Sequence, residues 1–143
     1  ISERIIKNNY DDIGQLESKI MGNGIQSGYK DVTPGISIVD DVITKTSGNG
    51  WNEGLATKGI IQGDGYVSFE TQLNDQRLMV GLSNNNSSAN YASIDYAIYF
   101  YGPTNKIIVY EAGTYKGYFD NYELGDVLKI QRKGNKIFYK KND

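Results

Sequence analysis

Short runs of alternating apolar and polar residues, separated by turn-forming residues, are the feature that most constrains this fold. The clearest example is the stretch 91–111, YASIDYAIYFYGPTNKIIVYE, in which β-branched and aromatic residues flank the turn-forming run 102–105. Side chains of a strand alternate between its two faces. We therefore expect two adjacent strands. The face of the first that is directed to a core carries Ile94, Tyr96, Ile98 and Phe100.

The opposite face of the same strand combines an acid, a small residue and two phenols. Aromatic rings stack on the apolar faces of sugar rings while Asp and Asn side chains bond the hydroxyl groups, so this face can bind a sugar. It can equally be a solvated face with ordinary tyrosines on it. The candidate ligand-binding residues lie on this face and in the loop before it: Asn84, Asn86, Tyr91, Asp95, Tyr99 and Tyr101.

Two loops supply further candidate groups. The loop 84–90, NNNSSAN, is rich in amides and hydroxyls, which can bond a sugar or lend carbonyl oxygens to Ca²⁺. It has no carboxylate of its own, so we expect no cofactor, with Ca²⁺ as the alternative and an ordinary loop as the simplest interpretation. The only tryptophan, Trp51, follows a Gly-rich run. It can stack on a sugar, but a core or lid position is the commoner role for so large a ring.

The residues that the chain lacks exclude most catalytic chemistry. It has no cysteine and no histidine, which removes disulfides, thiolate metal sites and nucleophiles activated by His. A glycosidase or lyase could still use tyrosine and a carboxylate pair, but no spacing relates Asp95 to Glu111. We therefore expect a protein that is not an enzyme.

Charge and hydropathy exclude two classes of partner. The net charge is −2, which offers no global field that would attract nucleic acid. No apolar run reaches the roughly 18 residues that a membrane-spanning helix needs. We expect neither nucleic-acid binding nor membrane insertion.

Turn-separated strands continue through the rest of the chain. The whole chain of 143 residues contains 17 glycines and 12 tyrosines. The segment VLKIQRKGNKIFYK predicts a hairpin about residues 133–135. Its inward-facing residues would be Leu128, Ile130, Ile137 and Tyr139. Almost no helical periodicity follows residue 30, so the sequence predicts an all-β antiparallel sandwich or barrel.

From residue 36 onward the pieces follow a characteristic order: GNGWNEG, GDGYVSFET, MVGLS, IDYAIYF, KIIVYEAG and LGDVLKIQRKGNKIFYKKND. This order resembles the concanavalin A-like jelly-roll modules, including the SPRY-like branch, of large bacterial surface proteins. The resemblance implies an antiparallel jelly-roll β-sandwich that recognises a ligand, often a glycan, without catalysis. The paired acidic motif of the glucanase members and the metal-ligand pattern of legume lectins are missing.

The beginning of the chain carries a second resemblance. Tyr10, Asp11, Gly14 and Leu16 resemble one YD repeat of the RHS family, whose repeats form stacked β-hairpins. A polar strand-turn-strand with a chance match, or a short helix over 13–20, are the alternatives. The predicted organisation is a YD-repeat-like lead-in over 1–30 and a β-sandwich recognition module over 31–143. The start at Ile1, without Met or a signal-like segment, suggests a piece of a longer chain.

Together these features predict a carbohydrate-binding, lectin-like adhesion module that uses surface tyrosines and hydrogen bonds from Asn and Asp. Its partner would be a glycan or polysaccharide, and its location secreted or on a bacterial cell surface. The alternative is a structural or protein-docking module within an RHS-type shell, in which the outward tyrosines contact other parts of the parent protein.

Overall fold

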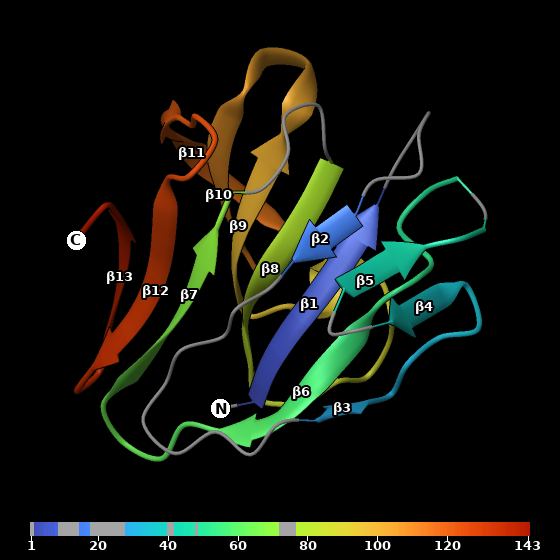
Figure 1. Ribbon diagram of the computed structural model, residues 1–143. Helices are drawn as coiled ribbons and strands as arrows, with labels where there is room; N and C mark the ends of the chain where they lie inside the picture. The colour runs from blue at the N-terminus through green and yellow to red at the C-terminus, as the bar shows by residue number, and fades with distance from the viewer. Residues whose placement is uncertain (1, 9–14, 18–27, 40–41, 48, 72–76) are drawn as a thin grey trace.

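The computed structural model describes residues 2–8, 15–17, 28–39, 42–47, 49–71 and 77–143 (Figure 1). Within these ranges the regular structure is antiparallel β-sheet with two short 3-10 helices, and no α-helix is present. The prediction of an all-β antiparallel fold is therefore confirmed. The strands form three sheets rather than the two of a simple sandwich.

A seven-stranded sheet forms the centre of the molecule (Figure 1). Its strands, in spatial order, are β11 (Thr114–Asn121), β10 (Lys106–Glu111), β9 (Tyr96–Tyr101), β8 (Arg77–Ser83), β1 (Ser2–Asn8), β6 (Leu55–Ile60) and β3 (Tyr29–Lys30). The turn predicted at 102–105 is the 3-10 helix η2 (Gly102–Thr104), which joins β9 to β10. Pro103 lies in its first turn, where a missing N–H is tolerated, and Asn105 ends it in the left-handed region with φ of 51°.

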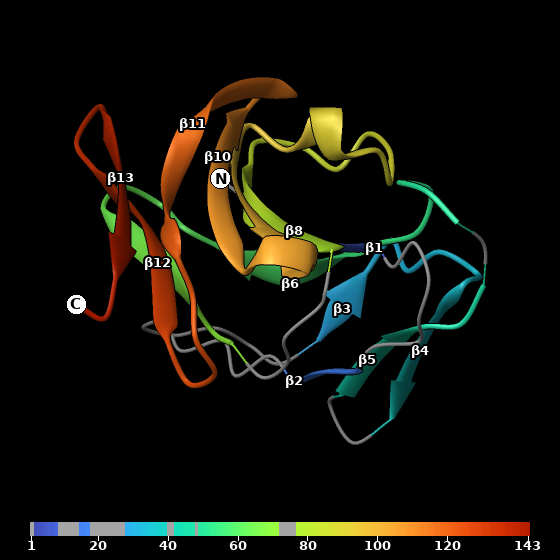
Figure 2. The same ribbon diagram turned by 90° about the horizontal axis from the view of Figure 1, so that it is seen from above.

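Two three-stranded sheets flank the large one. One has the order β13 (Lys136–Lys141), β12 (Val127–Lys133) and β7 (Gly65–Glu70), and the other the order β2 (Gln15–Glu17), β5 (Val42–Lys45) and β4 (Ile36–Val39). In Figure 2 these small sheets lie at different ends of the molecule, and the 3-10 helix η1 (Tyr91–Ser93) lies across β1 and β8 from β2 and β5. The large sheet thus presents one face to the small sheets and the other face to the loop that contains η1.

The described parts of the first thirty residues, 2–8, 15–17 and 28–30, share the sheets of the rest of the chain. β1 lies between β8 and β6, β2 pairs with β5, and β3 pairs with β6. The predicted boundary at residue 30 therefore coincides with no boundary between sheets. The YD-like motif lies mostly outside the described residues. Its described part, Gln15–Glu17, is a strand, so the alternative of a helix over 13–20 is wrong there.

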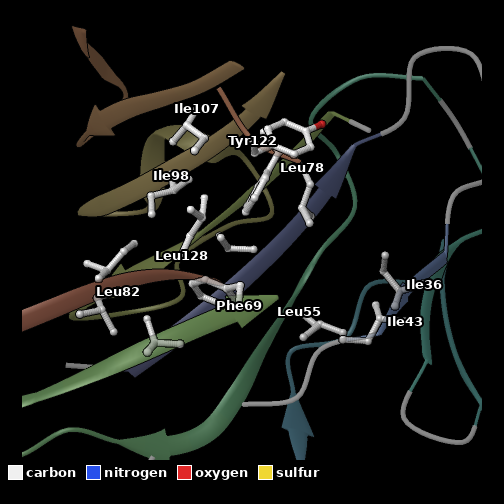
Figure 3. Packing of buried hydrophobic residues seen from close by; sticks show 14 residues of the cluster. Ile36, Ile43, Leu55, Phe69, Leu78, Leu82, Ile98, Ile107, Tyr122 and Leu128 are labelled. Atoms are coloured by element: carbon white, nitrogen blue, oxygen red, sulfur yellow. The ribbon is translucent and has the colours of Figure 1, made fainter. Parts of the chain in front are cut away.

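The main core confirms most of the predicted alternation. Ile98 and Phe100 are buried, and Tyr96 packs against them half-buried. Leu128 and Ile130 of β12 are buried against the same cluster, with Ile137 and Tyr139 at its margin, as the hairpin pattern predicted. Figure 3 shows Ile98 of the large sheet in one cluster with Phe69 and Leu128, which belong to the sheet β13–β12–β7. Apolar side chains from all three sheets join this cluster, since Ile36 and Ile43 extend it to β4 and β5.

Ile94 is the exception to the predicted alternation. It is fully buried, but it packs with Met79 and Ala97 on the other face of the large sheet. The reason is that β9 begins at Tyr96, so Ile94 follows the irregular backbone after η1 rather than the strand period. The prediction that Ile94 faces the main core is wrong.

We expect Ile98→Ala to lower the free energy of unfolding by about 2–5 kcal/mol, because Ile98 is fully buried in the central strand and the truncation leaves a cavity. Ile60→Ala is the matched control: Ile60 belongs to the same sheet but is 64% exposed, so its effect should stay within about 0.5 kcal/mol. Urea unfolding of both variants measures the difference. Equal effects would contradict the assignment of the core face.

Candidate functional site

The face of the large sheet that points away from the main core has an apolar floor. β8 and β9 pair so that Met79 lies opposite Tyr99 and Gly81 opposite Ala97. Met79, Ala97 and Ile94 are buried there in a second, smaller cluster. Gly81 is required at its position, since a Cβ there would lie 2.1 Å from the carbonyl oxygen of Tyr96 and 2.6 Å from Ile94.

Four aromatic side chains pack on this floor, namely Trp51, Tyr91, Tyr99 and Tyr110. Tyr101 and Tyr115 extend the set through contacts with Tyr99 and Tyr110, and we call the six rings the aromatic face. The ring centroid of Trp51 lies 5.3 Å from the ring centroid of Tyr91 and 5.3 Å from that of Tyr99. Tyr99 continues the contacts to Tyr101 at 5.8 Å and to Tyr110 at 6.0 Å. Four of the ring pairs meet edge to face, an arrangement that the ring quadrupole favours. The other two pairs are tilted.

The aromatic face is only partly covered by the rest of the protein. Five of its rings are half-buried, and Tyr115 on β11 is 58% exposed. Each ring therefore packs against at least one neighbouring ring while part of it remains in contact with water. This is the arrangement that a flat ligand with apolar patches can use, because the rings are held in place before the ligand arrives.

Two cations border the aromatic face at the end of β9. Arg77 and Lys106 are the residues that pair with Tyr101 from its two sides, one on β8 and one on β10. The guanidinium carbon of Arg77 lies 5.4 Å from the ring centroid of Tyr101. The ammonium of Lys106 lies 5.7 Å from the ring centroid of Tyr118 on β11. Both distances fall within the range of cation–π attraction.

A polar network holds the loop that delivers Trp51. Lys45 is only 3% exposed, and its Nζ donates to the carbonyl oxygen of Gly50 at 2.8 Å and to Oδ1 of Asn52 at 3.1 Å. Burial lowers the pKa of Lys45, and the charge of Glu53 opposes this shift. Glu53 in turn accepts a hydrogen bond from the backbone N–H of Gly35 at 2.9 Å. The hydrogen bonds from Lys45 thus hold the loop at Gly50 and Asn52, the residues on either side of Trp51.

The loop that delivers Tyr91 is also held by its own polar groups. The backbone N–H of Asn84 donates to Oδ2 of Asp95 at 2.7 Å, and the side-chain oxygen of Asn90 caps η1 by accepting from the N–H of Ala92 at 2.9 Å. The side-chain nitrogen of Asn86 donates to Asp31 at 2.8 Å, while its buried Oδ1 has no partner among the described residues.

The predicted site residues therefore fall into two groups. Tyr91, Tyr99 and Tyr101 come together on the aromatic face. Asn84, Asn86 and Asp95 belong to the loop 84–95 instead. Asp95 accepts a hydrogen bond from the backbone N–H of Asn84, and the side chain of Asn86 donates to Asp31.

Two rings of the aromatic face, Tyr110 and Tyr115, were not among the residues predicted from the sequence. The hairpin register about the 102–105 turn places Tyr110 opposite Ala97, a pairing that strand alternation could have revealed. Tyr115 lies opposite Tyr110, next to the two-residue turn 112–113 and before the register shifts farther along β11, so this hairpin could have revealed it in the same way. Trp51 was noted as a sugar-stacking or core residue; it is half-buried on the face opposite the main core.

Comparisons with protein-family models, with curated proteins and with solved structures found no match to this chain. Among the described residues, no group of three or more His, Cys, Asp or Glu side chains is placed to hold a metal ion. Within the same residues no helix is long and apolar enough to cross a membrane. The aromatic face is therefore the feature of the described residues that bears on function.

We expect Lys45→Met to lower the free energy of unfolding by about 1–3 kcal/mol, because the oxygens of Gly50 and Asn52 lose the buried ammonium that donates to them. The loosened loop should also shift the fluorescence of Trp51, the only tryptophan. Lys58→Met, at an exposed position of β6, is the control and should change neither. An unshifted emission spectrum in Lys45→Met would contradict the anchoring role.

The raised pKa values of two phenols, Tyr110 and Tyr139, predict how the stability of the fold changes at alkaline pH. Burial, with the phenols of Tyr91 and Tyr115 nearby, raises the pKa of Tyr110. Burial raises the pKa of Tyr139 well above its usual range, and the Glu111 carboxylate that accepts its hydrogen bond at 3.1 Å adds to the shift. The unfolded chain loses these protons near pH 10 while the folded protein keeps them. The stability they contribute is present below that pH and is lost as the pH rises through the folded pKa.

Tyr139→Phe should therefore reduce the loss of unfolding free energy above about pH 10, relative to the unaltered protein. The lowered pKa of Lys45 acts in the opposite direction, and comparing the two proteins cancels it. Urea unfolding across alkaline pH, with tyrosinate absorbance recorded in parallel, gives the measurement. Tyr118→Phe, at a residue 52% exposed, is the control. An identical pH profile in Tyr139→Phe would count against the effect.

Proposed function

We propose that this protein is a non-catalytic carbohydrate-binding module whose ligand lies on the aromatic face. The single observation that carries the proposal is the connected set of six half-covered aromatic rings on the sheet face opposite the main core. Sugar rings present apolar C–H faces that stack on such side chains, and their hydroxyls bond to polar groups at the border.

The rigidity of the aromatic face supports this proposal. The network at Lys45 and the capped helix η1 hold Trp51 and Tyr91 in place, so little conformational entropy is lost when a ligand binds. A shallow face still gives modest affinity, on the order of micromolar to millimolar for a single site. Repetition of modules in a longer parent chain would strengthen it.

The proposal includes a fold assignment finer than antiparallel β. The large sheet and the sheet β7–β12–β13 enclose the main core between them, which supports a concanavalin A-like jelly-roll. The modules that this chain resembles belong to large bacterial surface proteins, and we propose an adhesion role and a secreted or cell-surface location within a larger chain. The third sheet, β2–β5–β4, would be an addition to that plan.

A second candidate function is protein docking, as a structural module of an RHS-type shell. The observation that favours it is β11, which forms an edge of the large sheet and is exposed along most of its length. Tyr118 and Phe119 are among its exposed side chains. Edge strands can pair with another chain, and Tyr and Trp are common at the centres of protein interfaces.

Glycan-array screening followed by calorimetry tests the first proposal. For the best glycan we expect Tyr99→Ala and Tyr101→Ala each to weaken binding about threefold to tenfold, since each removes a stacking ring worth about 0.5–1.5 kcal/mol. Stacking near Trp51 should also change its fluorescence during the titration.

Tyr66→Ala is the matched control, because Tyr66 is a partly exposed tyrosine on β7, outside the aromatic face. Thermal unfolding of each variant shows whether it remains folded. The proposal fails if no glycan binds, or if the Tyr99 and Tyr101 variants bind as well as the Tyr66 variant does. Binding of a protein partner that Tyr118→Ala abolishes would favour docking instead.

A further inference from the structure

A continuous series of four rings leads across the aromatic face to the edge of the large sheet. The ring centroid of Tyr91 lies 5.3 Å from that of Trp51 and 5.9 Å from that of Tyr110. The ring of Tyr110 in turn lies 5.8 Å from that of Tyr115. Trp51 and Tyr91 come from loops, Tyr110 from β10 and Tyr115 from the edge strand β11. The series therefore ends at the margin of the sheet.

The hairpin between β10 and β11 positions the outer end of this series. Its turn has φ of 47° at Ala112 and 75° at Gly113, and positive values at both positions suit a two-residue hairpin turn. The turn sets Tyr115 opposite Tyr110, so both side chains lie on the same side of the sheet. Tyr110 lies opposite Ala97 of β9, which places the Cα atom of Tyr115 two strand spacings, about 10 Å, from that of Ala97.

The same turn packs against the loop that carries Tyr91. The backbone N–H of Ala112 donates to the carbonyl oxygen of Asp95 at 3.0 Å. A Cβ atom at Gly113 would lie 2.8 Å from the Cβ atom of Ala92 in η1, so glycine allows the turn to lie directly against this helix. These contacts hold the two parts of the series, one on the loop and one on the hairpin, at a fixed separation.

We propose that the aromatic face takes an extended chain of several β-1,4-linked pyranose units rather than a single terminal sugar; this rests on the glycan-binding function proposed above. A pyranose ring is similar in size to a phenol ring, so one sugar covers one side chain and part of its neighbour. Equatorial linkages keep such a chain extended and expose the apolar C–H face of each unit. Successive units can therefore lie on successive rings from Trp51 to Tyr115.

The two ends of the series differ in how they are surrounded. Trp51 is half-buried and contacts both Tyr91 and Tyr99, so the inner end is the denser group of rings. Tyr115 is exposed, as is most of β11, and among the described strands none follows β11 in the large sheet. A short chain should bind at the inner end, while a longer one can cover Tyr115 and continue past the edge.

Cello-oligosaccharides and chito-oligosaccharides of two to six units test this length requirement by calorimetry and Trp51 fluorescence. In at least one series we expect the six-unit member to bind at least about tenfold more tightly than the two-unit member, because each further stacked ring adds about threefold to tenfold. The rise should level off once the chain is longer than the series of rings.

Substitutions connect the length dependence to the outer ring. Tyr115→Ala should weaken six-unit binding about threefold to tenfold and leave two-unit binding nearly unchanged. Tyr115→Phe keeps the ring and should keep the length dependence. Tyr66→Ala is the control, since it removes a partly exposed phenol from β7, outside the aromatic face, and should change neither affinity. Thermal unfolding of each variant shows whether it remains folded, and the exposed position of Tyr115 makes its replacement a mild change.

The outcomes separate the extended-chain proposal from glycan binding itself. Equal affinity for two and six units in both series overturns the extended chain and leaves glycan binding intact. The same conclusion follows if Tyr115→Ala binds six units as tightly as the unaltered protein does, since a longer chain then gains only by offering more positions to the inner rings. A glycan-array hit without binding of either series also overturns it. Failure of both series and of the array removes glycan binding as well.

Discussion

The packing of β9 between β8 and β10 is the constraint on which the rest of this structure depends. Its residues alternate between two buried environments: Ile98 and Phe100 enter the main core, while Ala97 closes the floor beneath the aromatic face. A slip of one residue would exchange the two faces and place the phenols of Tyr99 and Tyr101 inside the sandwich. The strand register therefore fixes the core and the candidate site together.

The aromatic face is assembled from segments that are far apart in the chain. β9, β10 and β11 provide four of its rings, and two loops bring Trp51 and Tyr91 over the sheet. Those loops are ordered by polar networks rather than by apolar burial. A buried lysine fixes one, and a capped 3-10 helix fixes the other. Asn86 and Asp95, which the sequence predicted as ligand contacts, thus make hydrogen bonds that hold the loop carrying Tyr91.

Local patterns were a reliable guide to strands and a partial guide to the site. Strict alternation in β9 and β12 identified Ile98, Phe100, Leu128 and Ile130 as core residues, because both strands are regular and buried on one face. Ile94 was misplaced where the strand period had not yet begun. Tyr115 was missed although the two-residue turn 112–113 places it opposite Tyr110, before the register shifts between β10 and β11 begin. For Ile94 the irregular backbone, rather than the residue type, decided where the side chain lies.

By itself the sequence determined that this chain forms antiparallel strands with an aromatic side on β9, and that it lacks the histidines and cysteines of common catalytic sites. These properties follow from residue types and from a period of two, which act over a few neighbours. Only the tertiary structure decided that β1 lies inside the large sheet, that Trp51 meets Tyr99, and that Arg77 lies beside Tyr101. Such pairings join distant segments, and long-range packing, which no local pattern encodes, selects them.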